Sequence, residues 1–191
     1  MVENLEYENS EMAAAKRYVR LLGFLYFIAL IWVLVFKCNL NEFLYVAEQR
    51  TQTIWERLDF ALSRPMFVES IHCIISGTCP EEIMAFFFNF FALIPFGMTF
   101  GFFFKGLRAC FLSFITILCI EVFQLISCYG GLRLDDIVMN SLGAFVGVLI
   151  VKKLIVRMDP KQICKIARTL IYFSVPLDVF FVVNTIIHFP E

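Results

Sequence analysis

The sequence has few charged residues, and they do not favour one sign. Only 17% of the 191 residues are charged, and the formal net charge is −1. Because a nucleic-acid-binding protein needs a basic face, this composition argues against a nucleic-acid partner. There are only two histidines, and no two of the seven cysteines are spaced as CxxC. We therefore expect neither a metal site nor a cofactor.

Hydrophobic residues make up 60% of the chain, with 24 phenylalanines and a mean hydropathy of +0.80. This composition excludes an ordinary soluble domain. A membrane span needs roughly 20 apolar residues. The sequence predicts one all-α domain over 1–191, a polytopic transmembrane helical bundle of about five spans. The spans are expected near 17–36, 84–104, 107–128, 136–153 and 167–188.

Positive charges predict the orientation of these spans, because Lys and Arg are more frequent on the cytoplasmic side. With the amino terminus inside, 11 of the 16 Lys and Arg residues lie in inner segments. The expected protein is therefore a multi-pass protein of the cell membrane with a cytoplasmic amino terminus and an extracellular carboxyl terminus. Residues 1–16 form an acidic cytoplasmic tail without the basic start of a secretory signal.

Residues 38–83 form the one sizeable segment expected outside the membrane, and its apolar residues recur at roughly helical spacing. One interpretation is an amphipathic helix on the membrane surface, with Trp55 and Phe67 at headgroup level. The other is a helix that simply caps the bundle. Cys73 and Cys79 are either a disulfide, if the exterior is oxidising, or two free thiols.

Polar residues interrupt the apolar runs at one depth. At 1.5 Å per residue, Asn89 lies about 7 Å below the outer end of the second span, and Glu121 about 10 Å below that of the third. Gln124 and Asn140 lie about 6 Å below the outer ends of the third and fourth spans. Arg133, Asp135 and Asp136 occupy the connecting turn and the mouth of the fourth span.

Ionisable residues inside a membrane are expensive and usually mark function. The functional interpretation is an outward-opening pocket for an anionic or sugar-like ligand, with Arg133 as the charge-pairing group. The alternative is a structural network, in which Glu121 and Asp136 pair with Arg133 while the amides bond across helices. Asp178, two residues after Pro176, either extends such a pocket or bonds to the kinked backbone.

Small residues continue the polar stripe of the fourth span, because Asp136, Asn140, Gly143 and Gly147 share one helix face. We expect Gly143 and Gly147, and likewise Gly97 of the second span, to pack closely against a neighbouring helix. Pro95 predicts a kink in the second span.

These motifs carry a family resemblance. The pattern E-x-x-Q at 121–124, followed by D-x-x-x-N-x-x-G-x-x-x-G at 136–147, resembles the VanZ-like family of bacterial membrane proteins, as does NFFALIPFG at 89–97. The resemblance covers about residues 84–153. It carries the family pattern over to Asn89, Pro95, Gly97, Glu121, Gln124, Asp136, Asn140, Gly143 and Gly147. It implies a role in the bacterial cell envelope and a link to resistance to the glycopeptide teicoplanin.

Three functions compete at this stage. The first is a protein that binds a lipid headgroup, a cell-wall precursor or a lipid-tailed antibiotic at the outer leaflet. The second is an enzyme that uses Glu121 and Asp136 as acid and base on a lipid-linked substrate. No nucleophile–base pair or phosphate loop supports it, so we assign no catalytic residue. The third, a small transporter, would need an internal repeat, which the sequence does not show.

Overall fold

A computed structural model of the chain describes residues 2–34, 53–63, 67–77, 80–127 and 132–187. These residues contain helices and no strand, which confirms the all-α fold. The helices are α1 (Val2–Leu34), α3 (Ile54–Ser63), α4 (Val68–Ser76), α5 (Pro80–Phe103), α6 (Gly106–Ser127), α7 (Leu134–Lys153), a 3₁₀ turn η1 (Ile155–Arg157) and α8 (Pro160–Ile187).

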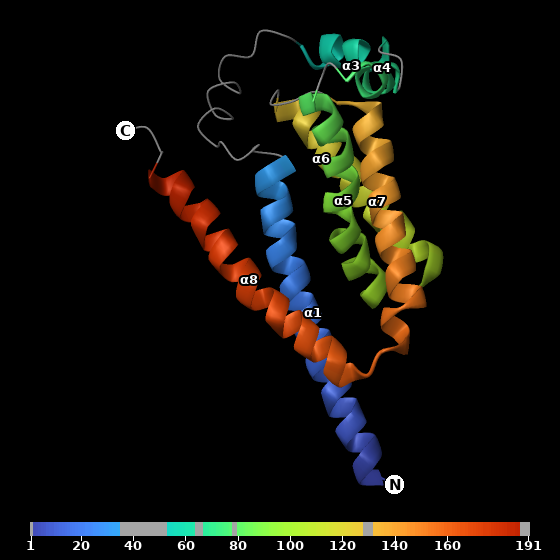
Figure 1. Cartoon of the computed structure of the whole chain (residues 1–191), viewed down its shortest axis with the longest axis vertical. Coiled ribbons are helices and arrows are strands. Elements are labelled where there is room, and N and C mark those ends of the chain that lie inside the picture. Colours follow the sequence, from blue (N-terminus) through green and yellow to red (C-terminus); the bar gives the residue numbers. More distant parts are fainter. Residues whose placement is uncertain (1, 35–52, 64–66, 78–79, 128–131, 188–191) are drawn as a thin grey trace.

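The helices form two groups (Figure 1). Helices α5, α6 and α7 run side by side, and the short helices α3 and α4 lie across one end of them. Helices α1 and α8 cross near the other end, where Ala15 packs with Ile163 and Cys164. Farther along, α8 diverges from α1 (Figure 1). The polar residues identified above thus lie at the end covered by α3 and α4.

Four described helices are long and apolar enough to cross a membrane, over Ser10–Leu34, Phe86–Phe103, Gly106–Ser127 and Leu134–Lys153. They correspond to the first four predicted spans, and only the turn at Lys105 separates α5 from α6. The fifth predicted span lies on α8 apart from its last residue, and its passage through a membrane stays a prediction. From Val2 onward, the acidic segment 1–16 forms the first part of α1.

Helices α5 and α7 touch backbone to backbone. A Cβ atom added at Gly97 would overlap the carbonyl oxygen of Ala144, and one at Gly143 would overlap that of Phe90. One added at Gly147 would overlap the carbonyl oxygen of Ile94. Glycine is thus required here for the helices to approach one another, and this contact sets α7 directly beside α5.

Helix α5 continues through Pro95, although proline supplies no backbone N–H. The hydroxyl of Tyr26 in α1 donates to the carbonyl oxygen of Ala92, one turn before the proline. Phe27 of α1 also stacks on Phe96, with ring centroids 6.2 Å apart. These contacts dock α1 on α5.

Helix α3 begins with a capping box formed by Thr53 and Glu56. The Thr53 N–H donates to Glu56 Oε2 at 2.7 Å, and the Glu56 N–H donates to Thr53 Oγ1 at 3.3 Å. The hydrogen bonds from the Thr53 backbone and then its side chain lower the pKa of Glu56 below its ordinary value of 4.5. The ionised Glu56 carboxylate therefore stabilises the folded state above pH 4.5. This contribution is lost as the pH falls through the lower pKa that Glu56 has in the folded state.

Both interpretations of the 38–83 segment find support in α3 and α4. Arg57 Nη1 donates to the carbonyl oxygen of Leu125 at 2.7 Å, so α3 does cap the end of α6. The side chains of Trp55 and Ile75 are nonetheless 78% and 81% exposed, as expected of residues that enter a membrane surface. Cys79 lies outside the described residues, so its pairing with Cys73 stays a prediction.

Candidate functional site

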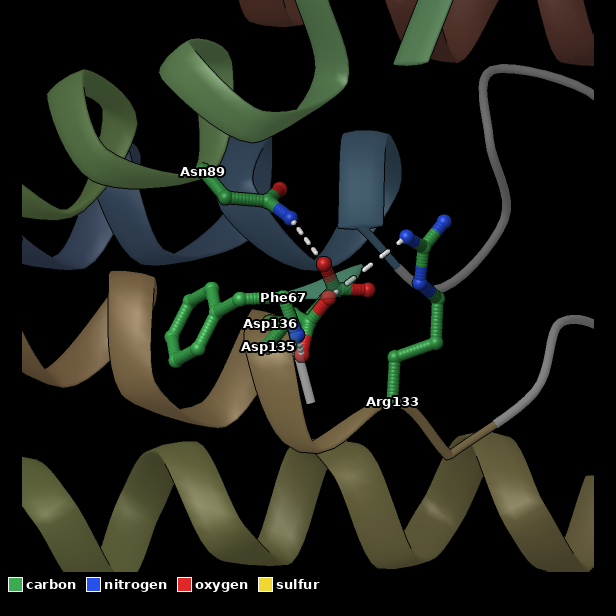
Figure 2. A network of polar contacts seen from close by, with 5 residues as sticks. All are labelled: Phe67, Asn89, Arg133, Asp135 and Asp136. Atoms are coloured by element: carbon green, nitrogen blue, oxygen red, sulfur yellow. Dashed lines mark hydrogen bonds and ion pairs between the residues drawn. The ribbon is translucent and has the colours of Figure 1, made fainter. Parts of the chain in front are cut away.

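Polar side chains of three helices meet where α5 and α6 flank α7. Asn89 Nδ2 on α5 donates to Asp136 Oδ1 on α7 at 2.8 Å (Figure 2). Asn140 Nδ2, one turn farther along α7, donates to Glu121 Oε1 on α6 at 3.2 Å. Asp136 and Glu121 thus each receive a hydrogen bond from a side-chain amide of a neighbouring helix. Helix α7 occupies the centre because it supplies one partner to each bond.

The pair formed by Glu121 and Asn140 is buried and incompletely bonded. The two residues are 3% and 2% exposed. Glu121 Oε2 and Asn140 Oδ1 are buried and have no hydrogen-bond partner in the described part of the chain. Most buried polar atoms in proteins are bonded, so two unbonded acceptors on one pair need an explanation. Each costs about 1–3 kcal/mol when left unsatisfied.

Asp135 connects α7 to Phe67, the residue that precedes α4. Its Oδ1 accepts a hydrogen bond from the Phe67 N–H at 2.9 Å, and its Oδ2 lies 3.9 Å from Arg133 Nη2 (Figure 2). The structure thus places Arg133 beside Asp135, the acidic residue that neither sequence interpretation assigned to it. Phe67 has a φ of 60°, a left-handed conformation that is rare for a bulky residue. The bond to Asp135 helps to hold this strained residue at the start of α4.

We expect Asp135→Ala to loosen α4, because a hydrogen bond to a charged acceptor contributes about 1.5–3 kcal/mol. The Phe67 amide should exchange with deuterium roughly ten to a hundred times faster than in the unsubstituted chain. Mass-spectrometric hydrogen exchange of the α3–α4 peptides measures this. Asp59→Ala, an exposed carboxylate on α3, is the matched control. Equal exchange in the two variants would show that Asp135 does not hold α4.

Gln124 lies away from the buried pair. Its Nε2 donates to the carbonyl oxygen of Leu34 at 2.5 Å. Leu34 is the last described residue of α1, so this bond ties α1 to α6. The sequence grouped Gln124 with Glu121, whereas the structure assigns it a partner 90 residues away.

Two cavities lie between the described helices. One of 390 Å³ lies between α1, α5 and α8, and one of 350 Å³ lies between α6 and α7. None of the polar residues predicted to line a pocket lines either of them: Asn89, Glu121, Gln124, Arg133, Asp135, Asp136 and Asn140. The second cavity is lined by Ser141, whose buried hydroxyl has no partner in the described residues.

Sequence reasoning did not identify Ser141, Arg57 or the backbone N–H of Phe67 as part of this region. A serine in an apolar helix and an arginine in an exterior segment are too common to be informative. A backbone donor leaves no trace in the sequence. Among the described residues, no three His, Cys, Asp or Glu side chains come together as metal ligands.

In a comparison with protein families, residues 23–157 match the VanZ/LLP1 family model. Comparison with curated proteins and with solved structures gives no match. The match extends beyond the 84–153 segment that carries the resemblance. It includes the last third of α1 together with α3 and α4, and α8 lies outside it. The match contains every polar residue of the cluster and covers more than half of the chain. The chain therefore belongs to the VanZ/LLP1 family.

Proposed function

We propose that this protein binds a ligand of the bacterial envelope at Glu121 and Asn140. The ligand is a lipid headgroup, a cell-wall precursor or a lipoglycopeptide of the outer leaflet, and binding contributes to teicoplanin-type glycopeptide resistance or to envelope homeostasis. The observation that carries the proposal is the pair of buried acceptors, Glu121 Oε2 and Asn140 Oδ1, that lack donors in the described residues. All three ligand classes offer ammonium, amide or hydroxyl donors.

Stability alone does not account for this pair. Hydrogen bonds between membrane helices average only about 0.6 kcal/mol. Each unsatisfied buried acceptor destabilises the fold by about 1–3 kcal/mol, so the two together outweigh the stabilisation from one such bond. A pair selected for stability would use its second oxygen atoms within the protein, as Asp135 does with Phe67 and Arg133. Unused acceptors favour a role toward a ligand.

The cavity between α6 and α7 supports a ligand that carries an apolar tail. Ser141 follows Asn140 in α7 and lines this cavity with Cys110 and five apolar residues, Phe114, Ile137, Val138, Leu142 and Phe145. A hydrocarbon tail fits such a wall, and the hydroxyl of Ser141, which has no partner among the described residues, adds one polar group next to the buried pair. This combination favours lipid-linked compounds over free sugars.

Ligand-dependent stabilisation of the purified full chain tests the proposal. We would measure its melting temperature with teicoplanin, with a glycopeptide that lacks an acyl tail, with phosphatidylethanolamine and with a lipid-linked cell-wall precursor. A ligand at one hundred times its Kd stabilises by about 2.7 kcal/mol, or about 5–10 °C for a chain of this size. At least one tailed compound should produce this shift.

Two variants make the result specific. The double substitution Glu121→Leu with Asn140→Leu removes both unbonded acceptors, and we expect it to abolish the shift. Thr116→Val is the matched control on α6, since its hydroxyl already bonds to the Leu112 carbonyl at 2.9 Å. A shift of equal size in the double variant, or none with any compound, would refute the proposal. In bacteria, the intact gene and the control should lower teicoplanin susceptibility, and the double variant should not.

A second candidate function is acid–base catalysis by Glu121 and Asp136 on a lipid-linked substrate. It is favoured by the different surroundings of the two carboxylates, which accept from amides of different helices. Glu121→Gln separates the candidates, because it removes a titrating group and keeps a hydrogen-bonding one. Turnover that disappears while ligand stabilisation persists would indicate an enzyme.

A further inference from the structure

The cavity of 390 Å³ lies at the opposite end of the bundle from the polar cluster. It is bordered by α1, α5, the end of α7, the α7–α8 connection and α8. An apolar cavity of about 150 Å³ already accommodates benzene, so this one is large enough for a substantial hydrocarbon. Its size falls within the range of about 300–1,000 Å³ found for ligand pockets.

The wall of this cavity is almost entirely apolar. Its three hydroxyl groups already donate to backbone carbonyl oxygens: Tyr26 to Ala92, Thr99 to Pro95 and Ser174 to Leu170. The other lining residues are apolar, among them Leu22, Met98 and Leu170. Because these hydroxyl hydrogens are already used and the rest of the wall is apolar, the part of a ligand that fits here is a hydrocarbon chain.

Two arginines directly follow residues that line this cavity. Arg20 follows the lining residue Val19, is exposed, and lies with its Cζ 5.7 Å from the centroid of the Phe103 ring. Arg168 follows the lining residue Ala167, is also exposed, and donates to the Tyr18 hydroxyl at 3.3 Å.

Within the described part of the chain, neither guanidinium is paired with a carboxylate. More exposed cations lie at this end: Lys16, Arg17, Arg157, Lys161 and Lys165. Two guanidinium groups on aromatic supports are thus available to an anion beside an apolar cavity.

We infer that this cavity holds one acyl chain of an anionic phospholipid, whose phosphate is bound by Arg20 and Arg168. The hydrocarbon wall and the adjacent cations correspond to the two parts of such a lipid. By the predicted orientation, the lipid belongs to the cytoplasmic leaflet. The site depends on α8, which lies outside the family match, and it does not depend on the ligand proposed for Glu121 and Asn140.

Native mass spectrometry of the detergent-purified full chain tests this inference with two lipids that have the same acyl chains, phosphatidylglycerol and phosphatidylcholine. Each basic residue near an anionic headgroup contributes about 1 kcal/mol, so two should favour phosphatidylglycerol by about thirty-fold. Arg20→Gln with Arg168→Gln should remove this preference. Arg108→Gln should leave it intact, because that exposed arginine rests on Phe104 and does not adjoin the cavity.

Substitutions that fill the cavity from either side test whether the acyl chain of the lipid lies in it. Ser174→Phe and Val19→Phe start from partly buried lining residues of α8 and α1, and each should weaken the binding of both lipids at least ten-fold. Equal affinity for the two lipids in the unsubstituted protein would overturn the inference. So would a preference that survives the double arginine variant, or unchanged binding in a folded cavity-filling variant. Because the two arginines are exposed, their variant decides the question even if both phenylalanine variants misfold.

Discussion

Gly143→Ala is expected to separate α5 from α7 and to lower the free energy of unfolding by about 3 kcal/mol, the upper end of the usual penalty for overpacking. The added Cβ would overlap the carbonyl oxygen of Phe90, which belongs to a helix backbone and cannot rotate away. Helix α7 would have to move outward as a whole. Gly97→Ala and Gly147→Ala should behave alike, because they meet the backbone of the same helix pair. Reversible unfolding in lipid bicelles measures the loss.

Gly101→Ala is the matched control on the same face of α5. Its Cβ would lie 3.0 Å from the Cα of Val148, a tight contact that a small shift relieves. Alanine also has a higher helix propensity than glycine by about 1 kcal/mol, which offsets the contact. The control should therefore differ little from the unsubstituted chain. A Gly143→Ala variant as stable as Gly101→Ala would show that the glycines do not determine the helix separation.

Asn140→Leu is expected to destabilise the protein by about 2–3 kcal/mol, because it leaves the buried Glu121 carboxyl without its donor. Replacing both residues by leucine should recover most of this loss, to within about 1 kcal/mol of the unsubstituted protein. Replacing both members of a buried pair with apolar groups of similar volume often leaves the free energy of unfolding unchanged. Replacing only one member leaves the other buried and unpaired. A double-mutant cycle of unfolding free energies measures the coupling.

This cycle also separates folding from binding. The double leucine variant should fold as well as the unsubstituted chain while it no longer responds to ligand. If the two single substitutions instead add without coupling, Glu121 and Asn140 do not act as a pair. If the double variant fails to fold, the pair is required for the structure, and the case for a ligand weakens.

The sequence predicted the features that depend on regular spacing. Apolar length identified the four helices that are long enough to cross a membrane. The shared helix face of Asp136, Asn140, Gly143 and Gly147 is the face on which α7 meets α5 and α6. The similar depths of the polar residues below the outer ends agree with two bonds in the structure, from Asn89 to Asp136 and from Asn140 to Glu121. Helical geometry is local, so such inferences hold without knowledge of the whole fold.

Contacts between segments that are distant in the chain could not be predicted from the sequence. Nothing in the chain indicates that Gln124 bonds to the Leu34 carbonyl, or that Asp135 accepts from Phe67, because both involve backbone groups of segments that meet only in the folded protein. Likewise, the 390 Å³ cavity forms where α8 crosses α1 and α5, at an angle that no local pattern encodes. The outward-opening pocket stays a prediction, since the two cavities described are lined by other residues.

A structure of the protein in lipid nanodiscs with the stabilising compound bound would test most directly whether Glu121 and Asn140 form a binding site. We predict density that belongs to no protein atom, with a donor within about 3 Å of both Glu121 Oε2 and Asn140 Oδ1. Density found elsewhere, with these two oxygen atoms still enclosed by the protein alone, would contradict this account and leave the pair a structural contact between α6 and α7.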